Sequence, residues 1–466
     1  MSPARLHLSL AAALALCAAP IAAQQLVNLP TGSWAYDITP DGEVVVGSSG
    51  SDGFIWRWRV DPAPTIVPGG TFTGVSDDGT VLCGNIDPSS ESSTAGIWTE
   101  ATGWQSLGFV PGTPATCGGG LSSAYDISGD GTTVVGLAWI DGCDGAGFRW
   151  TAATGLQTLQ HLANGHNRCS AISGDGLSLG GFAQGSFSRT PAYWAPDTSG
   201  FVVDPNLQGE VYNFTEDGSQ SVGTLYFSGS LYTAFVRDTQ SGVFTNLGKL
   251  QSGWAAAASD LSEDGSVIVG FDYISLSRKA WVWTSGDGIV SMADRLAAYG
   301  LTGLPNFLVC SAVSDDGTVV VGGAQPVGGG AFSTAGFIAE LVPPHWTSAG
   351  IGLAGTAGVP KLAASGPLTG GSPTSVVLTQ GKPSAPAAFV VGLTAVNLPF
   401  KQGVLVPFPD HLLLIPALSS HGSVGLSFNW PNGLPSGFAL YWQVLINDAV
   451  APAGFALSNA LQSLTP

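Results

Sequence analysis

Two histidines and a set of aspartates are the residues of this 466-residue sequence with the most obvious potential for chemistry. His161 and His166 share one polar loop and could ligate a metal or contact a substrate. Asp141 and Asp144 flank Cys143 and could chelate calcium. Exposed loop residues explain both groups as well, and for the histidines the sequence favours that simpler interpretation.

Sequence motifs for known catalytic machinery are missing from the chain. It contains no Gly-x-Ser-x-Gly elbow, no His-Glu-x-x-His motif and no phosphate-binding loop. Seven further aspartates, each followed by glycine, lack the spacing of an EF-hand or a nonapeptide calcium repeat. We therefore expect no catalytic residue, no bound metal and no cofactor.

The seven Asp-Gly pairs belong to a repeat that organises most of the chain. Each copy reads apolar residue, Ser or Thr, any residue, Asp, Gly, four residues, Gly. The pairs are Asp41 and Gly42, Asp78 and Gly79, Asp130 and Gly131, Asp175 and Gly176, Asp217 and Gly218, Asp264 and Gly265, and Asp316 and Gly317. The pattern predicts a tight hairpin turn with its glycine in the left-handed conformation, so we interpret these residues as structural.

The elements around each turn predict four short strands per repeat. β-Branched runs such as residues 267–269 follow the turn, and a third strand often ends in Trp, as at Trp56 and Trp98. The motif glycines 42 and 317 are six repeats apart, about 46 residues each, which suits a propeller blade. The fold predicted is all-β: a seven-bladed β-propeller closed by the N-terminal strand at residues 26–29, followed by a small β-sandwich.

Three segments are expected from the order of the chain. Residues 1–23 read as a secretory signal peptide, with Arg5 before an apolar run and small residues before the cleavage site. Residues 24–344 are the expected propeller. Residues 345–466 lose the repeat and carry short alternating stretches broken by Pro and Gly, which predicts a β-sandwich domain. No later run is long enough to cross a bilayer as a helix, so we expect an exported protein without membrane insertion.

Charge and cysteines limit the partners and the cross-links. The net charge is −18, and residues 345–466 contain three Lys and only two Asp, so the acidity lies in the repeats. Such a surface argues against nucleic acid and anionic membranes. Of the five cysteines that follow the signal peptide, three occupy strand positions of the repeat and are expected to be free. Cys117 and Cys143 lie in loops and are the expected disulfide.

The repeats resemble the bacterial extracellular HAF-repeat family, whose units read roughly A-x-x-I-S-x-D-G-x-x-V-V-G with a later A-F-x-W. The best copy here is residues 124–131 with Phe148, Arg149 and Trp150. The tail resembles a C-terminal module of secreted proteins from environmental bacteria, on residues 363–367, 434–443 and 454–459. The resemblance implies a secreted, cell-surface or periplasmic bacterial repeat protein, and it implies no catalytic residue.

Two function classes remain open for such a scaffold. The first is a non-catalytic binding or surface-structural protein, expected to be a monomer, with a glycan or a cell-surface protein as partner. The alternative is a propeller enzyme, a polysaccharide lyase or glycoside hydrolase, using loop carboxylates and histidine. In both cases we expect the ligand on the face opposite the Asp-Gly turns, where the longer loops gather. The residues expected there are Trp139, His161, His166 and Arg295.

Overall fold

The structure, a computed structural model, describes the chain from Leu26 to Thr465 with short gaps. The described residues are 26–88, 90, 92–110, 121–140, 143–185, 188–227, 231–299, 301–330, 332–341, 345–366, 368–435 and 437–465. The expected signal peptide, residues 1–23, therefore lies outside the described residues. Within them, no helix combines the length and the apolar character that crossing a membrane requires.

Seven four-stranded antiparallel sheets occupy residues 26–341. The first four are β2 (Ser33–Ile38), β3 (Val44–Ser49), β4 (Asp52–Arg57) and β5 (Thr65–Val67); β6 (Gly70–Val75), β7 (Val81–Ile86), β8 (Thr94–Thr99) and β9 (Gly103–Gly108); β10 (Ser122–Ile127), β11 (Thr133–Ile140), β12 (Asp144–Thr151) and β13 (Gly155–Thr158); and β14 (Asn167–Ile172), β15 (Leu179–Gln184), β16 (Arg189–Trp194) and β17 (Gly200–Val202).

The last three sheets include the one exception to consecutive strand order. The fifth sheet consists of β18 (Gly209–Phe214), β19 (Gln220–Tyr226), β20 (Tyr232–Asp238) and β21 (Phe244–Gly248). The sixth consists of β22 (Ala255–Leu261), β23 (Val267–Ile274), β24 (Ser277–Thr284) and β25 (Gly288–Ser291). Helix α1 (Met292–Ala298) follows β25. The seventh is β26 (Asn306–Val313), β27 (Val319–Gln325), β28 (Ala335–Glu340) and β1 (Leu26–Thr31). β1 pairs antiparallel with β28, with Leu26 opposite Ala339, so this sheet joins the two ends of the repeat region.

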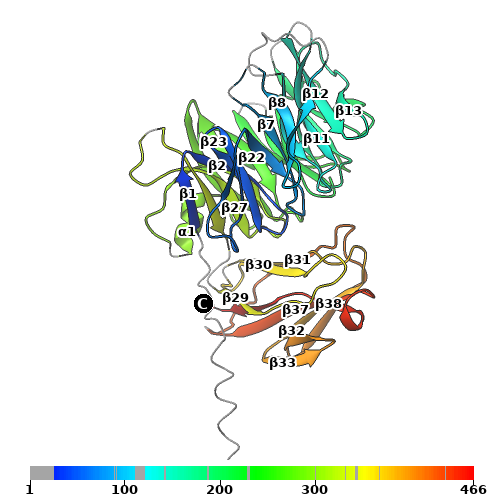
Figure 1. Ribbon diagram of the computed structural model, residues 1–466. Helices are drawn as coiled ribbons and strands as arrows, with labels where there is room; N and C mark the ends of the chain where they lie inside the picture. Colours follow the sequence, from blue (N-terminus) through cyan, green and yellow to red (C-terminus); the bar gives the residue numbers. More distant parts are fainter. Residues whose placement is uncertain are drawn as a thin grey trace, which may run out of the picture.

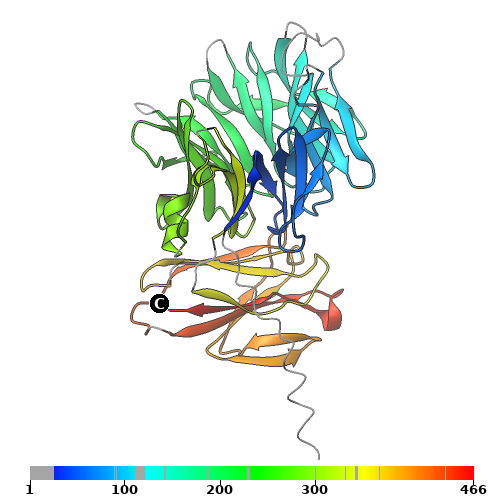
Figure 2. The same cartoon turned by 60° about the vertical axis from the view of Figure 1, so that its left-hand side comes forward.

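Hydrophobic clusters join each sheet to the next in the order of the chain. Successive side chains of a strand point to opposite faces of its sheet. Each sheet has apolar side chains on both faces and packs one face against each of its two neighbours. Six clusters join the first six sheets to their successors. The remaining cluster joins Val45 and Phe54 of the first sheet to Val321 and Ile338 of the seventh. Together with the radial arrangement of the sheets (Figures 1 and 2), this confirms the expected all-β propeller scaffold.

The glycine that closes each repeat faces a β-bulge in the first strand of its sheet. In the third sheet the register shifts between Ala124 and Asp126, opposite Gly136. A Cβ on Gly136 would overlap the carbonyl oxygen of Ser123 and lie 2.8 Å from the ring of Phe148. The same overlap with a first-strand carbonyl oxygen recurs in every repeat, which explains why glycine stands there each time. These positions are Gly47, Gly84, Gly136, Gly181, Gly223, Gly270 and Gly322.

Residues 345–465 form a separate group of three sheets, and the two larger ones share one hydrophobic cluster. The six-stranded sheet contains β29 (Trp346–Gly350), β32 (Ala387–Gly392), β35 (His411–Ile415), β37 (Ala439–Asn447), β38 (Phe455–Leu457) and β39 (Ala460–Leu464), with the 3-10 helix η2 (Pro452–Gly454) before β38. The smaller sheets are β30 (Lys361–Ser365), β31 (Pro373–Thr379) and β36 (Val424–Asn429), and β33 (Ala395–Phe400) with β34 (Gly403–Pro407). We call this group the tail.

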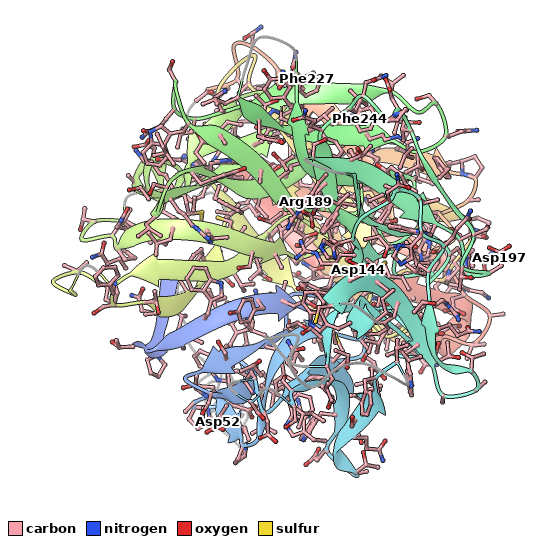
Figure 3. All side chains as sticks on the ribbon, turned by 90° about the horizontal axis from the view of Figure 1, so that it is seen from above. Asp52, Asp144, Arg189, Asp197, Phe227 and Phe244 are labelled. Carbon is pink, nitrogen blue, oxygen red and sulfur yellow. The ribbon has the colours of Figure 1, made fainter. Side chains whose placement is uncertain are left out.

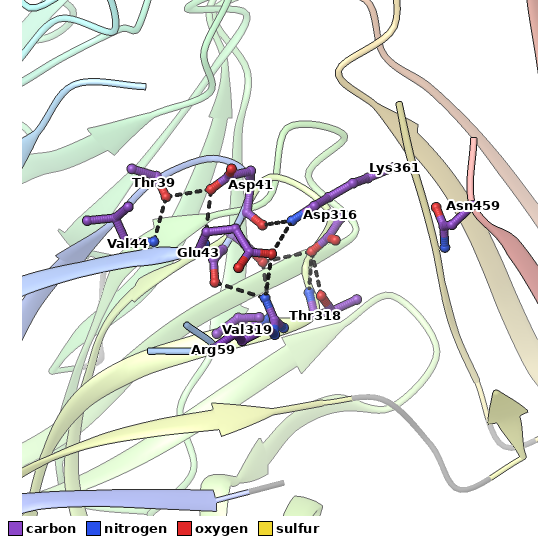
Figure 4. A network of polar contacts seen from close by, with 12 residues as sticks. Thr39, Asp41, Glu43, Val44, Arg59, Asp316, Thr318, Val319, Lys361 and Asn459 are labelled. Atoms are coloured by element: carbon purple, nitrogen blue, oxygen red, sulfur yellow. Dashed lines mark hydrogen bonds and ion pairs between the residues drawn. The ribbon is translucent and has the colours of Figure 1, made fainter. Parts of the chain in front are cut away.

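The tail packs against the end of the propeller that carries the Asp-Gly turns (Figures 1 and 4). Lys361, at the start of β30, donates hydrogen bonds to the carbonyl oxygen of Asp41 and, at 2.8 Å, to Glu43 Oε1. Arg59 contacts the same Glu43 oxygen at 3.0 Å and Glu340 Oε1 at 2.7 Å. One network of charges therefore joins the tail to the first and seventh sheets.

Substituting Lys361→Met is expected to loosen the tail. The change removes the cation but keeps the aliphatic length, so Glu43 loses one of its two partners and the carbonyl of Asp41 loses its donor. Hydrogen bonds to charged groups contribute about 1.5–3 kcal/mol each. Calorimetry should show the tail unfolding at a lower temperature, with the propeller transition nearly unchanged. The matched control is Lys401→Met, whose ammonium contacts only the Phe455 ring of the tail itself among the contacts described. Equal transitions for Lys361→Met and the parent would contradict the role of this network.

Candidate functional site

The Asp-Gly turns are built alike in all seven repeats. In the third, Ser128 Oγ donates to Asp130 Oδ1 at 2.7 Å, the amide of Thr132 donates to the same oxygen at 2.9 Å, and the amide of Thr133 donates to Ser128 Oγ at 3.0 Å. The φ angles of the turn glycines lie between 66° and 72°. The glycines concerned are Gly42, Gly79, Gly131, Gly176, Gly218, Gly265 and Gly317. Each turn Asp thus accepts bonds from its own turn, and local geometry accounts for its presence.

Backbone groups of the turn Asp or of the residue before it link neighbouring sheets around a central axis. Backbone hydrogen bonds of 2.9–3.0 Å run from one sheet to the next at this level. They join Asp77 to Gly129, Gly129 to Gly174, Asp175 to Glu216, Glu263 to Asp315 and Asp315 to Pro40. Between the fifth and sixth sheets the carboxylate of Glu263 accepts from the amide of Glu216 at 2.9 Å instead. Pro40 has no amide hydrogen, so it accepts such a bond but donates none.

A small central cavity of about 60 Å³ lies beside these links and is lined by all seven sheets. Three aspartates in it each bridge two neighbouring sheets. Asp37 accepts from the amides of Ile38 at 2.8 Å and Val75 at 2.9 Å. Asp126 and Asp260 do the same toward the fourth and seventh sheets. These carboxylates therefore substitute for backbone acceptors at the centre of the propeller.

The central carboxylates have pKa values well above the usual range. Burial raises the pKa of Asp37 to about 7, with a smaller contribution from the charge of Asp126. Burial also raises the pKa of Asp126 to about 6 and that of Glu263 to about 8. Asp77 is exposed, and the partial burial of its carboxyl beside the central cavity raises its pKa to about 6, while His421 of the tail opposes the shift. A group of carboxylates this close together holds protons near neutral pH.

The repeat contains a sequence signal for these carboxylates, at a position outside the Asp-Gly motif. Asp37, Asp126 and Asp260 each stand two residues before the Ser or Thr of the repeat, and Asn213 occupies the same place in the fifth sheet. The position therefore recurs in four of the seven repeats. Among the described residues no three His, Cys, Asp or Glu side chains are arranged to hold a metal ion. The interactions of the central carboxylates support a structural role.

The expected binding residues do not gather in one place. The rings of Trp139 and His166 meet edge to face with centroids 6.4 Å apart, and Nδ1 of His166 accepts from the amide of Gly145 at 2.7 Å. His161 is exposed on the preceding loop. Asp144 Oδ1 lies 3.8 Å from His166 Nδ1, while Asp141 lies outside the described residues.

The placement expected for Arg295 was wrong. It lines a cavity that also contains tail residues, on the side of the propeller that carries the Asp-Gly turns. The physical reason is helix α1, which begins at Met292 directly after β25 with Ser291 as its N-cap, where the sequence analysis expected a loop. The helix therefore runs back toward the tail instead of continuing to the opposite face (Figure 1).

The cysteines fall into the two groups that the repeat suggests. Cys83, Cys169 and Cys310 are free and buried in the propeller, and burial raises the pKa of each thiol far above its ordinary value. They are inert, packed side chains. Cys117 lies outside the described residues, so the disulfide between Cys117 and Cys143 stays a prediction.

A cluster of charged residues that the sequence analysis did not single out lies on the face opposite the tail, which we call the open face. Glu210 has a side chain only 2% exposed and pairs with both Arg168 and Arg189, the latter at 2.9 Å. Ser170 also donates to Glu210, at 2.8 Å. Seen from the open face, Arg189 lies near the centre of the propeller, with Asp144 beside it (Figure 3). We call Arg168, Arg189 and Glu210 the arginine cluster.

Aromatic rings frame the arginine cluster. The guanidinium of Arg168 lies 4.7 Å from the ring centre of Tyr125, and that of Arg189 lies 4.1 Å from the ring centre of Phe182. Tyr125 is the extra residue of a β-bulge in β10. The open face thus combines two cations, one buried carboxylate and aromatic surfaces.

No family model and no curated protein matches the sequence. Solved structures with a similar course of the chain include TolB from Acinetobacter baumannii, at 12% identity and a TM-score of 0.37, covering 55% of this chain and 62% of that one. An oligogalacturonate lyase from Vibrio parahaemolyticus matches at 14% identity and 0.45, covering 68% and 92%. The β-propeller domain of the trilobed protease from Pyrococcus furiosus matches at 10% and 0.42, covering 66% and 98%. This chain thus spans less than two thirds of the Acinetobacter TolB, and similarity at this level says nothing about its function.

Proposed function

We propose that this chain is an exported bacterial binding or surface-structural protein whose ligand is a glycan or another cell-surface component. Its scaffold is a monomeric seven-bladed propeller of the HAF-repeat type, residues 24–344, followed by a sandwich domain, residues 345–466. The ring is closed by β1, which supplies the fourth strand of the last blade. Support for closure comes from the pairing of β1 with β28 and from the cluster shared by the first and seventh sheets.

The observation that carries the binding proposal is the arginine cluster on the open face. Arg189 is about half exposed, at 49%, whereas its partner Glu210 is buried. The hydroxyl groups of a sugar form strong hydrogen bonds with charged donors and acceptors. The apolar C–H face of the sugar ring stacks on aromatic rings such as that of Tyr125. The cluster also has two cations for one carboxylate, in a protein of net charge −18. We therefore place a glycan with a carboxylate or other anionic group at this position.

The first test is a glycan array with the mature chain and two matched variants. Arg189→Ala removes the exposed cation, while Glu210 keeps Arg168 and Ser170 as partners. We expect binding to fall roughly 10- to 100-fold, the value of one or two charge-assisted hydrogen bonds. The melting temperature should stay within about 2 °C of the parent. Arg57→Ala, an exposed arginine on β4, is the control and should bind like the parent.

The outcome also separates this proposal from its alternative. A polysaccharide lyase or glycoside hydrolase would release shorter saccharides, detected as new reducing ends when the array ligands are incubated with the protein. Release that stops in Arg189→Ala would favour an enzyme on the same face. Binding that survives Arg189→Ala and is lost with the tail would contradict the choice of the open face.

A further inference from the structure

β35 forms one edge of the six-stranded sheet of the tail, because it pairs with β32 and with no other described strand. Its side chains from His411 to Leu414 are exposed. The three leucines at positions 412, 413 and 414 are 58%, 46% and 73% exposed. An edge strand also presents a row of unpaired backbone N–H and C=O groups. β35 therefore combines free hydrogen-bonding groups with three consecutive leucines that lie largely outside the core.

The leucines continue rows of side chains that are buried in the neighbouring strands. Leu413 lies opposite Phe389, which lies opposite Val444, and both of these core residues are fully buried. On the other face of the sheet, Leu412 lies opposite Val390, which is 1% exposed. Side chains directly opposite each other in antiparallel strands share a face and pack together. Each row thus ends in an exposed leucine, where a further apolar strand would continue it.

The opposite edge of the same sheet lacks these properties. β29 also has five residues, but its pairing shifts register between Ser348 and Gly350, and its exposed residues are Thr347 and Ser348. Such irregularities twist an edge strand away from a prospective partner. β35 pairs with β32 without a register shift, and Pro416 stands just outside the strand. The sheet is therefore protected at one edge and open at the other.

The charges around β35 favour a second copy of this chain as its partner. Between residues 392 and 416 the sequence contains one Lys, one Asp and one His, and no other residue that can carry a charge. The acidity of the protein lies in the propeller, whereas β32 and the β33–β34 hairpin lie on the side of the tail away from it (Figures 1 and 2). Two copies can therefore meet at β35 without repulsion between their acidic surfaces.

The strand is also complementary to itself. Antiparallel pairing about a twofold axis through the middle of β35 places the two Leu413 side chains opposite each other and pairs each Leu412 with a Leu414. The leucines then pair on both faces of the joined sheet, and the row that contains Phe389 continues across the axis. The backbone groups at the edge of each copy become the hydrogen-bond partners of the other.

We propose that two copies of this chain pair antiparallel through β35, so that their six-stranded sheets join into one continuous sheet. Each propeller remains a ring formed by one chain. The pairing takes the place of the monomer expected for the whole chain, and it gives each particle two open faces. The dimer does not depend on the glycan proposed as the ligand, so either proposal can fail without the other.

Sedimentation equilibrium of the mature chain tests the pairing. We expect the parent to have twice the mass of one chain. Leu413→Lys should raise the Kd of the dimer at least about 10-fold, because two ammonium groups then face each other at the twofold axis. The matched control is Leu276→Lys, at an 86% exposed leucine between β23 and β24, and it should dimerise like the parent. A parent with the mass of one chain up to its solubility limit would overturn the proposal, as would a folded Leu413→Lys variant with an unchanged Kd.

A cysteine at the twofold axis tests the register. Leu413→Cys should form a disulfide between two copies on mild oxidation, because opposite Cα atoms in antiparallel strands lie about 4.5–5.5 Å apart, within the range of a disulfide. Leu276→Cys should not cross-link, and the native free cysteines are buried. The change keeps a small apolar side chain, so it also serves if Leu413→Lys folds poorly. A dimeric Leu413→Cys variant that stays free of cross-links would show that the copies meet at another surface.

Discussion

Replacing Gly136 with alanine is expected to destabilise the propeller by about 3 kcal/mol or more. The added Cβ would overlap the carbonyl oxygen of Ser123, which belongs to the opposite strand and cannot move without disturbing the bulge. It would also press on the ring of Phe148, which is fully buried. Neither neighbour is a flexible side-chain end, so relief requires a shift of the backbone. Chemical denaturation followed by tryptophan fluorescence measures the loss.

The control is an alanine at a glycine without such neighbours. Gly185 follows β15, has a φ angle open to other residues, and a Cβ there meets no atom within 4 Å. Gly185→Ala should change the free energy of unfolding by less than about 0.5 kcal/mol. A Gly136→Ala variant as stable as Gly185→Ala would mean that the bulge tolerates a side chain. The recurrence of glycine at this position would then need another explanation.

Stability is expected to decrease as the pH rises from about 5 to 8. Asp37, Asp126 and Glu263 have folded-state pKa values of about 7, 6 and 8, above those of an unfolded chain. Over that interval the folded protein therefore holds more protons than the unfolded chain, and the free energy of unfolding falls with pH. One pKa unit corresponds to ~1.4 kcal/mol, so even partial shifts amount to several kcal/mol.

Acid should destabilise the protein for the opposite reason. Burial tends to raise the pKa of the turn residues Asp78 and Asp130, but hydrogen bonds within each turn outweigh it and lower the pKa. Their contribution is lost as the pH falls through these depressed values, below about 4. Urea titrations at intervals of half a pH unit should therefore find the maximum of stability near pH 4–5.

Glu263→Gln is the variant that isolates one central carboxyl. The amide oxygen of glutamine can still accept the bond from the Glu216 amide, while the charge that develops near pH 8 is removed. We expect the variant to be more stable than the parent at pH 8, with the difference vanishing toward pH 5. A parent protein that gains stability between pH 5 and 8 would contradict the raised pKa values.

The repeat made the propeller predictable because the same physical constraints recur seven times. Gly131 and Asp130 carry a turn whose chemistry is local, so the sequence is enough to place it. The pairing of β1 with β28 could be inferred because residues 26–29 have no partner before the first repeat. The free, buried cysteines followed from their alignment with strand positions such as Val46 and Ala124.

The sites were harder to predict because they depend on contacts between repeats. Glu210 and Arg168 are 42 positions apart and read as ordinary strand residues until neighbouring sheets bring them together. Arg295 was assigned to the wrong face because residues 293–307 were interpreted as a loop, although Ser291 and Asp294 form the N-terminal cap of a helix. The docking of the tail depends on Lys361, one of only three lysines in residues 345–466, and its partners lie 318 or more positions away.

The pairing of Leu26 with Ala339 has a consequence for how the protein is made. A chain emerges from the ribosome beginning at its N-terminus, so β1 appears before every other strand of the propeller that the structure describes. Its partner β28 follows only after all the other strands of the propeller. Until then β1 and the growing stack of sheets both present unpaired edges, which invite pairing with other chains. Nascent or truncated molecules that end before residue 335 should therefore depend on chaperones and be removed by proteases, whereas the full-length chain escapes both.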